Sequence, residues 1–109
     1  MVFDREEDSL EYEDWVYVPN FPEYVVSNLG RIHKTGRVGG RDFDLTPSED
    51  GHIYVNLQID GNWERRRFRL DRIVAFAFLK VPRNFPMYDV IHLDGDPTNC
   101  RATNLKWDV

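Results

Sequence analysis

The sequence has 109 residues and a formal net charge of −5, from 14 Lys and Arg residues against 19 Asp and Glu residues. This length favours a single domain with a modest core. No apolar run approaches the ~18 residues of a membrane-spanning helix, and we expect no signal peptide. The single cysteine, Cys100, excludes an internal disulfide and fits a reducing cytosol. An isoelectric point near 5.1 argues against a simple basic nucleic-acid binder.

The negative charge is concentrated at the N-terminus. Residues 1–14 sum to −6, and residues 15–109 sum to +1. We therefore expect residues 1–14 to form an acidic, flexible leader. Two functional alternatives are a phosphate mimic that binds a partner and an arm that shields a basic surface of the same chain. The acidic residues concerned are Asp4, Glu6, Glu7, Asp8, Glu11, Glu13 and Asp14.

The sequence after residue 14 first predicts a series of short strands. Aromatic and β-branched residues favour strands over 15–18, 24–27 and 31–33. Asn28-Leu29-Gly30 predicts the tight turn before the third strand, because Asn and Gly tolerate a positive φ. Several glycines in 34–51 predict a loop.

Residues 53–107 predict a hairpin, a helix and a C-terminal unit of short elements. Apolar residues alternate over 53–59, and Asp60-Gly61 predicts a two-residue turn into a return strand over 63–70. Asp71 is expected to cap a helix over 72–79. A strand over 90–93, a turn over 94–96 and a last element over 104–107 follow. The order predicts an α+β fold, with small antiparallel sheets followed by a helix and a C-terminal unit.

Two stretches of the sequence resemble the HNH homing endonucleases of phages and introns. Trp15, Phe21-Pro22, Tyr24 and the run 26–31 are similar to an N-terminal motif of that family, and the run 51–57 resembles its connecting strand. The runs 71–78, 90–96 and 104–107 are similar to its HNH core. The resemblance implies a ββα-metal-like C-terminal unit. It divides the chain into a leader (1–14), an N-terminal β motif (15–60) and an HNH-like core (61–109) that stops short of the family's C-terminal helix.

The resemblance implies cutting or nicking of DNA with one divalent cation, Mg²⁺ or Mn²⁺. His92 matches the general base, and histidine suits that role because it exchanges protons near neutral pH. Asn104 matches the asparagine that braces the active-site loop. The first metal-ligand position is Ile91, which has no donor atom, and the second lies beyond Val109. We therefore expect no metal ligand and no cofactor, and one-metal hydrolysis is disfavoured.

A stripe of arginines remains as a candidate nucleic-acid surface. In the strand over 63–70, alternation places Arg65, Arg67 and Arg69 on one face, where guanidinium groups suit phosphate contacts. Arg31 belongs to a second basic cluster. The alternative is that these charges only protect an exposed strand edge.

Three hypotheses of function follow. The preferred one is a catalytically degenerate HNH-type protein that acts by binding DNA or a DNA-binding host protein, such as a nuclease inhibited through the acidic leader as a DNA mimic. The first alternative is an active metal-dependent nicking endonuclease with His92 as base. The second is a non-catalytic DNA-binding regulator that uses the strand Arg65–Arg69. The resemblance implies the cytoplasm of a bacterial host and no membrane partner.

Overall fold

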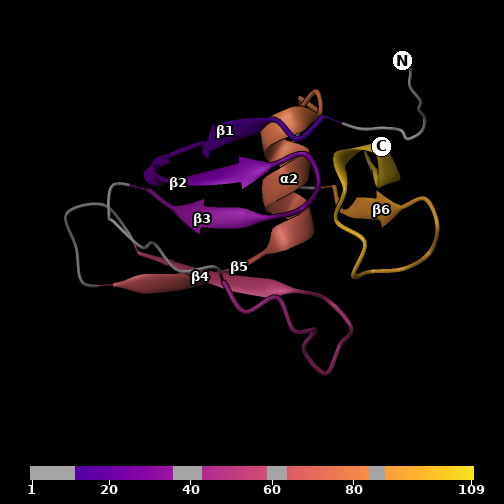
Figure 1. The fold of residues 1–109 in the computed structure, drawn as a ribbon. Coiled ribbons are helices and arrows are strands. Elements are labelled where there is room, and N and C mark those ends of the chain that lie inside the picture. Colours follow the sequence, from indigo (N-terminus) through magenta and orange to yellow (C-terminus); the bar gives the residue numbers. More distant parts are fainter. Residues whose placement is uncertain (1–11, 36–42, 59–63, 84–87) are drawn as a thin grey trace, which may run out of the picture.

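Three small antiparallel sheets surround one helix in the computed structural model, which describes residues 12–35, 43–58, 64–83 and 88–109 (Figure 1). The helix α2 (Leu70–Phe78) stands behind the three-stranded sheet. The hairpin β4–β5 lies below that sheet in Figure 1, and β6 lies on the far side of the helix. The expected α+β class, with small antiparallel sheets around a helix, is confirmed.

The first sheet has the order β1-β2-β3, formed by Trp15–Val18, Phe21–Ser27 and Ile32–Lys34. Tyr24, Val26 and Ile32 are buried, so one face of this sheet belongs to the core. The expected turn before β3 is confirmed, with Gly30 at φ 88° and its N–H donating to the Ser27 carbonyl.

The hairpin pairs β4 (Tyr54–Gln58) with β5 (Arg65–Arg69). The predicted alternation is confirmed, since Val55 and Leu57 are buried and Phe68 lies opposite Val55. The predicted two-residue turn is wrong, because it would pair Gln58 with Trp63, whereas the register pairs Gln58 with Arg65. The connection therefore covers 59–64, of which 59–63 lie outside the described residues.

Helix α2 begins two residues before the predicted start. Arg69, in an extended conformation, is the N-cap, and no side chain caps the helix. The expected capping role of Asp71 is therefore wrong, because its carboxylate is engaged elsewhere. Leu70, Ile73 and Val74 form the buried face of the helix.

The last sheet pairs β6 (Val90–His92) with β7 (Leu105–Trp107), and a short 3₁₀ turn, Ala102–Asn104, leads into β7. Val90, Leu105 and Trp107 are buried, which places this sheet against the helix. Among the described residues, no helix is both long and apolar enough to cross a membrane.

Candidate functional site

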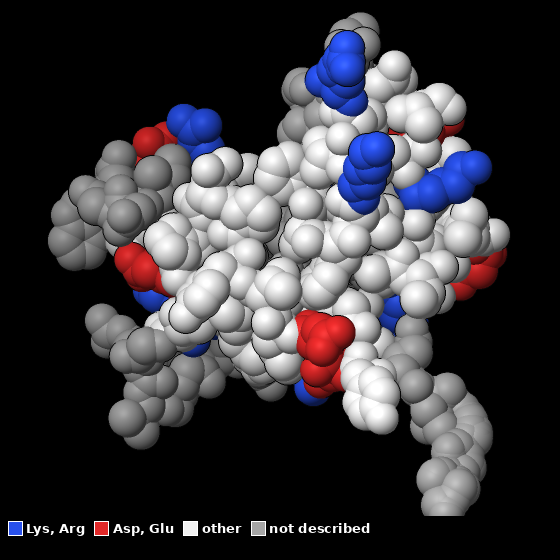
Figure 2. All heavy atoms as spheres, turned by 90° about the horizontal axis from the view of Figure 1, so that it is seen from above, with Lys and Arg blue, Asp and Glu red and all other residues white. Residues whose placement is uncertain are grey.

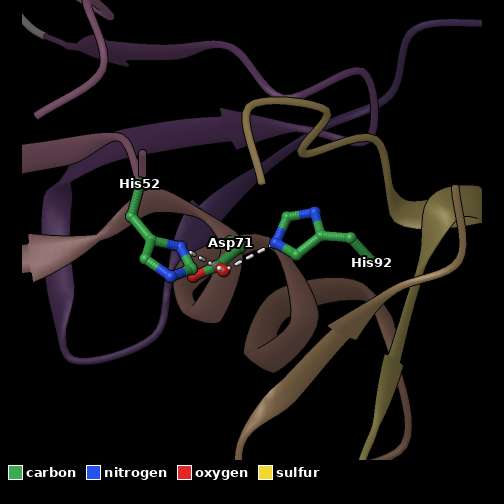
Figure 3. A group of neighbouring side chains, drawn as sticks. All are labelled: His52, Asp71 and His92. Carbon is green, nitrogen blue, oxygen red and sulfur yellow. Dashed lines mark hydrogen bonds and ion pairs between the residues drawn. The ribbon is translucent and has the colours of Figure 1, made fainter. Parts of the chain in front are cut away.

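Three side chains from distant parts of the chain meet beside the start of α2. His52 comes from the segment before β4, Asp71 from the first turn of α2, and His92 from the end of β6 (Figure 3). One nitrogen of each imidazole and one oxygen of the carboxylate all lie within 4.8 Å of one another. The group combines one acid with two bases, a composition typical of proton-transfer and metal sites.

The hairpin register explains how His52 reaches the helix. Tyr54 lies opposite Arg69, and the Leu70 N–H donates to the Ile53 carbonyl at 2.9 Å. His52, which precedes Ile53, is therefore held beside the first turn of α2. The sequence reasoning missed His52. Continuing the antiparallel pairing backwards from β4, past the end of β5 and into α2, would have indicated it.

The carboxylate of Asp71 is almost fully buried, with 2% exposure. Arg69 binds it through two hydrogen bonds, from Nε to Oδ1 at 3.0 Å and from Nη2 to Oδ2 at 2.7 Å. Burial alone would raise the pKa of Asp71, but hydrogen bonds from Arg69 and His92 outweigh it and hold the pKa below its usual value. Asp71 is therefore an anion at neutral pH.

Both ring nitrogens of His92 are engaged. Nδ1 lies 3.0 Å from the Asn99 carbonyl oxygen, which only accepts, so Nδ1 carries a proton. Nε2 lies 2.8 Å from Asp71 Oδ2. This nitrogen therefore faces a carboxylate oxygen and not solvent. Both nitrogens of His92 are thus in contact with protein groups, and its side chain is only 7% exposed, so neither nitrogen is placed to meet an attacking water.

His52 is bound less completely. Its Nδ1 lies 3.6 Å from Asp71 Oδ2, too far for a hydrogen bond. This nitrogen is buried and has no hydrogen-bond partner among the residues that the structure describes. His52 Nδ1 therefore faces Asp71 Oδ2 without forming a hydrogen bond to it.

Asn104 connects the two ends of the loop after β6. Its amide donates to Asp94 Oδ1 and to the Asn99 carbonyl, each at 3.0 Å, and its Oδ1 accepts from the Asp94 N–H. The same Asn99 carbonyl also contacts His92 Nδ1. Asn104 therefore helps to hold the carbonyl oxygen that orients the His92 imidazole.

The arginine stripe of β5 is divided in the structure. Arg65 and Arg67 are exposed, and the guanidinium of Arg67 lies over the Tyr54 ring at 3.7 Å from its centroid. Arg69 does not belong to that surface, because it is bound to Asp71 and also lies 3.1 Å from Asp89 Oδ1. The placement of Arg69 among the phosphate-binding residues is therefore corrected.

Arg31 is paired with the end of the acidic leader. Its guanidinium binds both carboxylate oxygens of Glu13 and lies over the Trp15 ring. The Asn28 side chain binds the backbone at Tyr12 and at Asp14, which fixes this end of the leader. The other acidic residues of the leader lie outside the described residues; they are Asp4, Glu6, Glu7, Asp8 and Glu11.

Residues 13–58 match the model of the NUMOD4 motif. Two uncharacterised HNH endonucleases of Acanthamoeba polyphaga mimivirus are similar to the chain. The first, L245, is 32% identical over 78 residues, and the second, L247, is 29% identical over 103 residues. These matches cover 70% and 91% of this chain.

Among solved structures, the HNH homing endonuclease I-HmuI, described as binding and cleaving DNA, matches with a TM-score of 0.73 and 26% identity over 86% of this chain. The chain is a relative of the HNH homing endonucleases. It spans 23% and 24% of the length of the two viral HNH proteins and 51% of the solved HNH chain. The resemblance seen in the sequence is therefore confirmed by both sequence and fold.

The residues at the expected HNH metal position do not fit a cation. Ile91, next to His92, is a half-buried aliphatic residue in β6 and offers no donor. Among the described residues, the group that could hold a metal is instead His52, Asp71 and His92.

Proposed function

We propose that this HNH-type chain acts by binding DNA, and that it does not hydrolyse DNA by the family's one-metal route with His92 as the base. The engagement of both His92 nitrogens carries this proposal, because a general base needs a free lone pair near the attacking water. Ile91 in the place of a ligand points the same way, since charge on the reacting phosphate would lack its stabilising cation.

The DNA surface is best sought on the hairpin β4–β5. Arg65 and Arg67 are exposed there, and Tyr54 supports Arg67 while Ser48 accepts a hydrogen bond from it at 3.0 Å. An arginine held in this way loses little side-chain entropy when it binds phosphate. On the opposite face, basic and acidic side chains of the described residues lie at separate points without one continuous basic patch (Figure 2).

The test compares DNA binding and plasmid nicking in the same samples. We expect the wild type to bind duplex DNA with an affinity that falls steeply with salt, and to leave supercoiled plasmid intact with Mg²⁺, Mn²⁺ or Ni²⁺. Arg67→Glu should weaken binding, and Lys80→Glu, the same charge reversal beyond the other end of α2, should weaken it less. If the wild type nicks the plasmid and His92→Ala does not, the proposal that His92 does not act as the base is wrong. Absence of binding at low salt would overturn the DNA role.

A second candidate function is inhibition of a DNA-binding host protein through the leader, which carries −6 over residues 1–14. A pull-down from host lysate should then lose its partner when residues 1–14 are deleted. Retention of the partner without the leader would contradict mimicry. The pairing of Glu13 with Arg31 favours the other role of the leader, in which it covers a basic residue of its own chain.

A further inference from the structure

We propose that His52, Asp71 and His92 form a binding site for a transition-metal dication such as Zn²⁺, Co²⁺ or Ni²⁺. The site goes beyond the proposed DNA binding and does not depend on it. It also differs in position from the Ile91 position at which the family resemblance places a ligand. The argument rests on the donor atoms, their spacing and the groups that hold them.

The donor atoms select the class of metal. Two imidazole nitrogens and one carboxylate oxygen form a borderline set that suits Zn²⁺, Co²⁺ and Ni²⁺. Mg²⁺ instead prefers oxygen ligands and retains several waters. Three protein ligands around a tetrahedral ion leave a fourth position for water or a phosphate oxygen.

The spacing of the donors already approaches that of a metal site. Ligands about 2.0–2.1 Å from a tetrahedral ion lie roughly 3.4 Å from one another. The His52 Nδ1 to Asp71 Oδ2 distance is 3.6 Å, and the His92 Nε2 to Asp71 Oδ2 distance is 2.8 Å. No donor pair is more than 4.8 Å apart. Movements of about 1 Å therefore suffice to bring all three onto one ion.

The groups behind the donors are those that metal ligands usually have. A ligating histidine typically donates its other N–H to a carbonyl or carboxylate, and His92 Nδ1 contacts the Asn99 carbonyl in this way. The second oxygen of Asp71, Oδ1, accepts from Arg69 Nε. The imidazole of His52 presents a buried Nδ1 that has no hydrogen-bond partner in the described residues.

The ion would replace the contacts now made by Asp71 Oδ2. His92 Nε2 would bind the ion as a deprotonated nitrogen, with any proton it carries released to solvent, and the Arg69 Nη2 bond to Oδ2 is given up. Arg69 has a second carboxylate available, because its Nη2 lies 3.1 Å from Asp89 Oδ1. Arg69 can therefore lose its hydrogen bond to Asp71 Oδ2 and remain paired with Asp89, while its Nε still donates to Asp71 Oδ1.

The experiment is titration of untagged, metal-free protein with Zn²⁺ by calorimetry, and with Co²⁺ by visible absorption, without DNA. We expect one ion per chain and a tetrahedral Co²⁺ spectrum. His52→Ala should weaken binding by more than about 10-fold. His33→Ala is the matched control, because His33 stacks on Trp15 in β3 rather than joining the cluster.

Two results would overturn the proposal. One is wild-type binding weaker than about 1 mM, and the other is an equal loss in His52→Ala and His33→Ala. If circular dichroism shows that Asp71→Asn or His92→Ala does not fold, His52→Ala still decides, because the His52 side chain is 27% exposed and its Nδ1 makes no hydrogen bond to any residue that the structure describes. DNA binding measured with a chelator present is a separate readout, so failure of one proposal leaves the other intact.

Discussion

His92 Nε2 lies 2.8 Å from Asp71 Oδ2, although the two residues are 21 positions apart in the sequence. This contact ties strand β6 to the first turn of helix α2. It also occupies the ring nitrogen that would otherwise be free to accept a proton. One pair of atoms thus links the stability of the fold to the chemistry of the site.

Asp71→Asn should lower the free energy of unfolding by about 3 kcal/mol, because it removes the anion between Arg69 and His92 in a buried setting. The value is at the low end for breaking a buried ion pair, since Asp89 still pairs with Arg69. Urea denaturation measures it. Asp89→Asn is the control: the Asp89 side chain is 60% exposed, and we expect a change within about 1 kcal/mol. If both substitutions lowered the free energy of unfolding equally, the buried pairing of Asp71 with Arg69 and His92 would not be the source of the stability.

The contribution of Asp71 should depend on pH in a defined direction. Its pKa in the folded protein lies below the usual 3.8, since hydrogen bonds from Arg69 and His92 outweigh the effect of burial. A lowered pKa stabilises the fold above the unfolded value, and this stabilisation is lost as the pH falls through the folded value. The difference in unfolding free energy between wild type and Asp71→Asn should therefore shrink as the pH falls from the unfolded value of 3.8 toward the lower folded value. A difference that stays constant over that range would refute the linkage.

Gly30→Ala should destabilise the fold more than Gly95→Ala. Both glycines have a positive φ, 88° and 78°, so each substitution costs about 1–2 kcal/mol in the backbone. A Cβ at Gly30 would also lie 3.2 Å from the Cys100 carbonyl carbon and oxygen, whereas a Cβ at Gly95 meets nothing within 4 Å. Thermal denaturation of the two variants isolates the steric part. Equal shifts in Tm would show that the loop of Cys100 moves aside freely.

The thiol of Cys100 should resist alkylation in the folded protein. Burial raises its pKa to about 12, so very little thiolate forms near neutral pH. Native protein at pH 8 should react with iodoacetamide far more slowly than protein in urea, as mass spectrometry can follow. A native rate equal to the denatured rate would mean that the loop around Cys100 opens readily.

Glu13→Gln should increase DNA affinity by ~2- to 5-fold at low salt, because it releases Arg31 from a competing carboxylate. Fluorescence anisotropy with labelled duplex measures the change. Glu23→Gln serves as the control with the same change in net charge. Glu23 pairs only weakly with Lys34, at 3.9 Å, and its removal should have a smaller effect. A matching increase in both variants would mean that overall charge, rather than Arg31, determines the gain.

Local patterns predicted the parts of the fold that depend on neighbouring residues. The alternation around Val55 and Leu57 located β4, and Asn28-Leu29-Gly30 located the turn before β3. The hairpin turn at Asp60-Gly61 was wrong because strand register is set by packing of both strands against the core, which a dipeptide signal does not report.

The site was harder to predict, because its members belong to three separate segments. His92 was found through family resemblance. Asp71 was assigned to helix capping, since a local pattern cannot show that Arg69 and His92 take its carboxylate. His52 has no local motif at all and becomes visible only when β4 is paired with β5.

The Asn28 carbonyl accepts a hydrogen bond from the Ala102 N–H at 2.8 Å, beside the close approach of Gly30 to Cys100. The turn between β2 and β3 is thus fastened to the segment that leads into β7. Two-stranded sheets are marginal by themselves, and both two-stranded sheets here pack against α2. The unit that folds is therefore larger than the NUMOD4 motif, which ends at residue 58. In this chain the last strand of the motif, β4, pairs with β5, and both the sheet and the hairpin pack on α2, so residues 13–58 depend on partners that lie outside the motif.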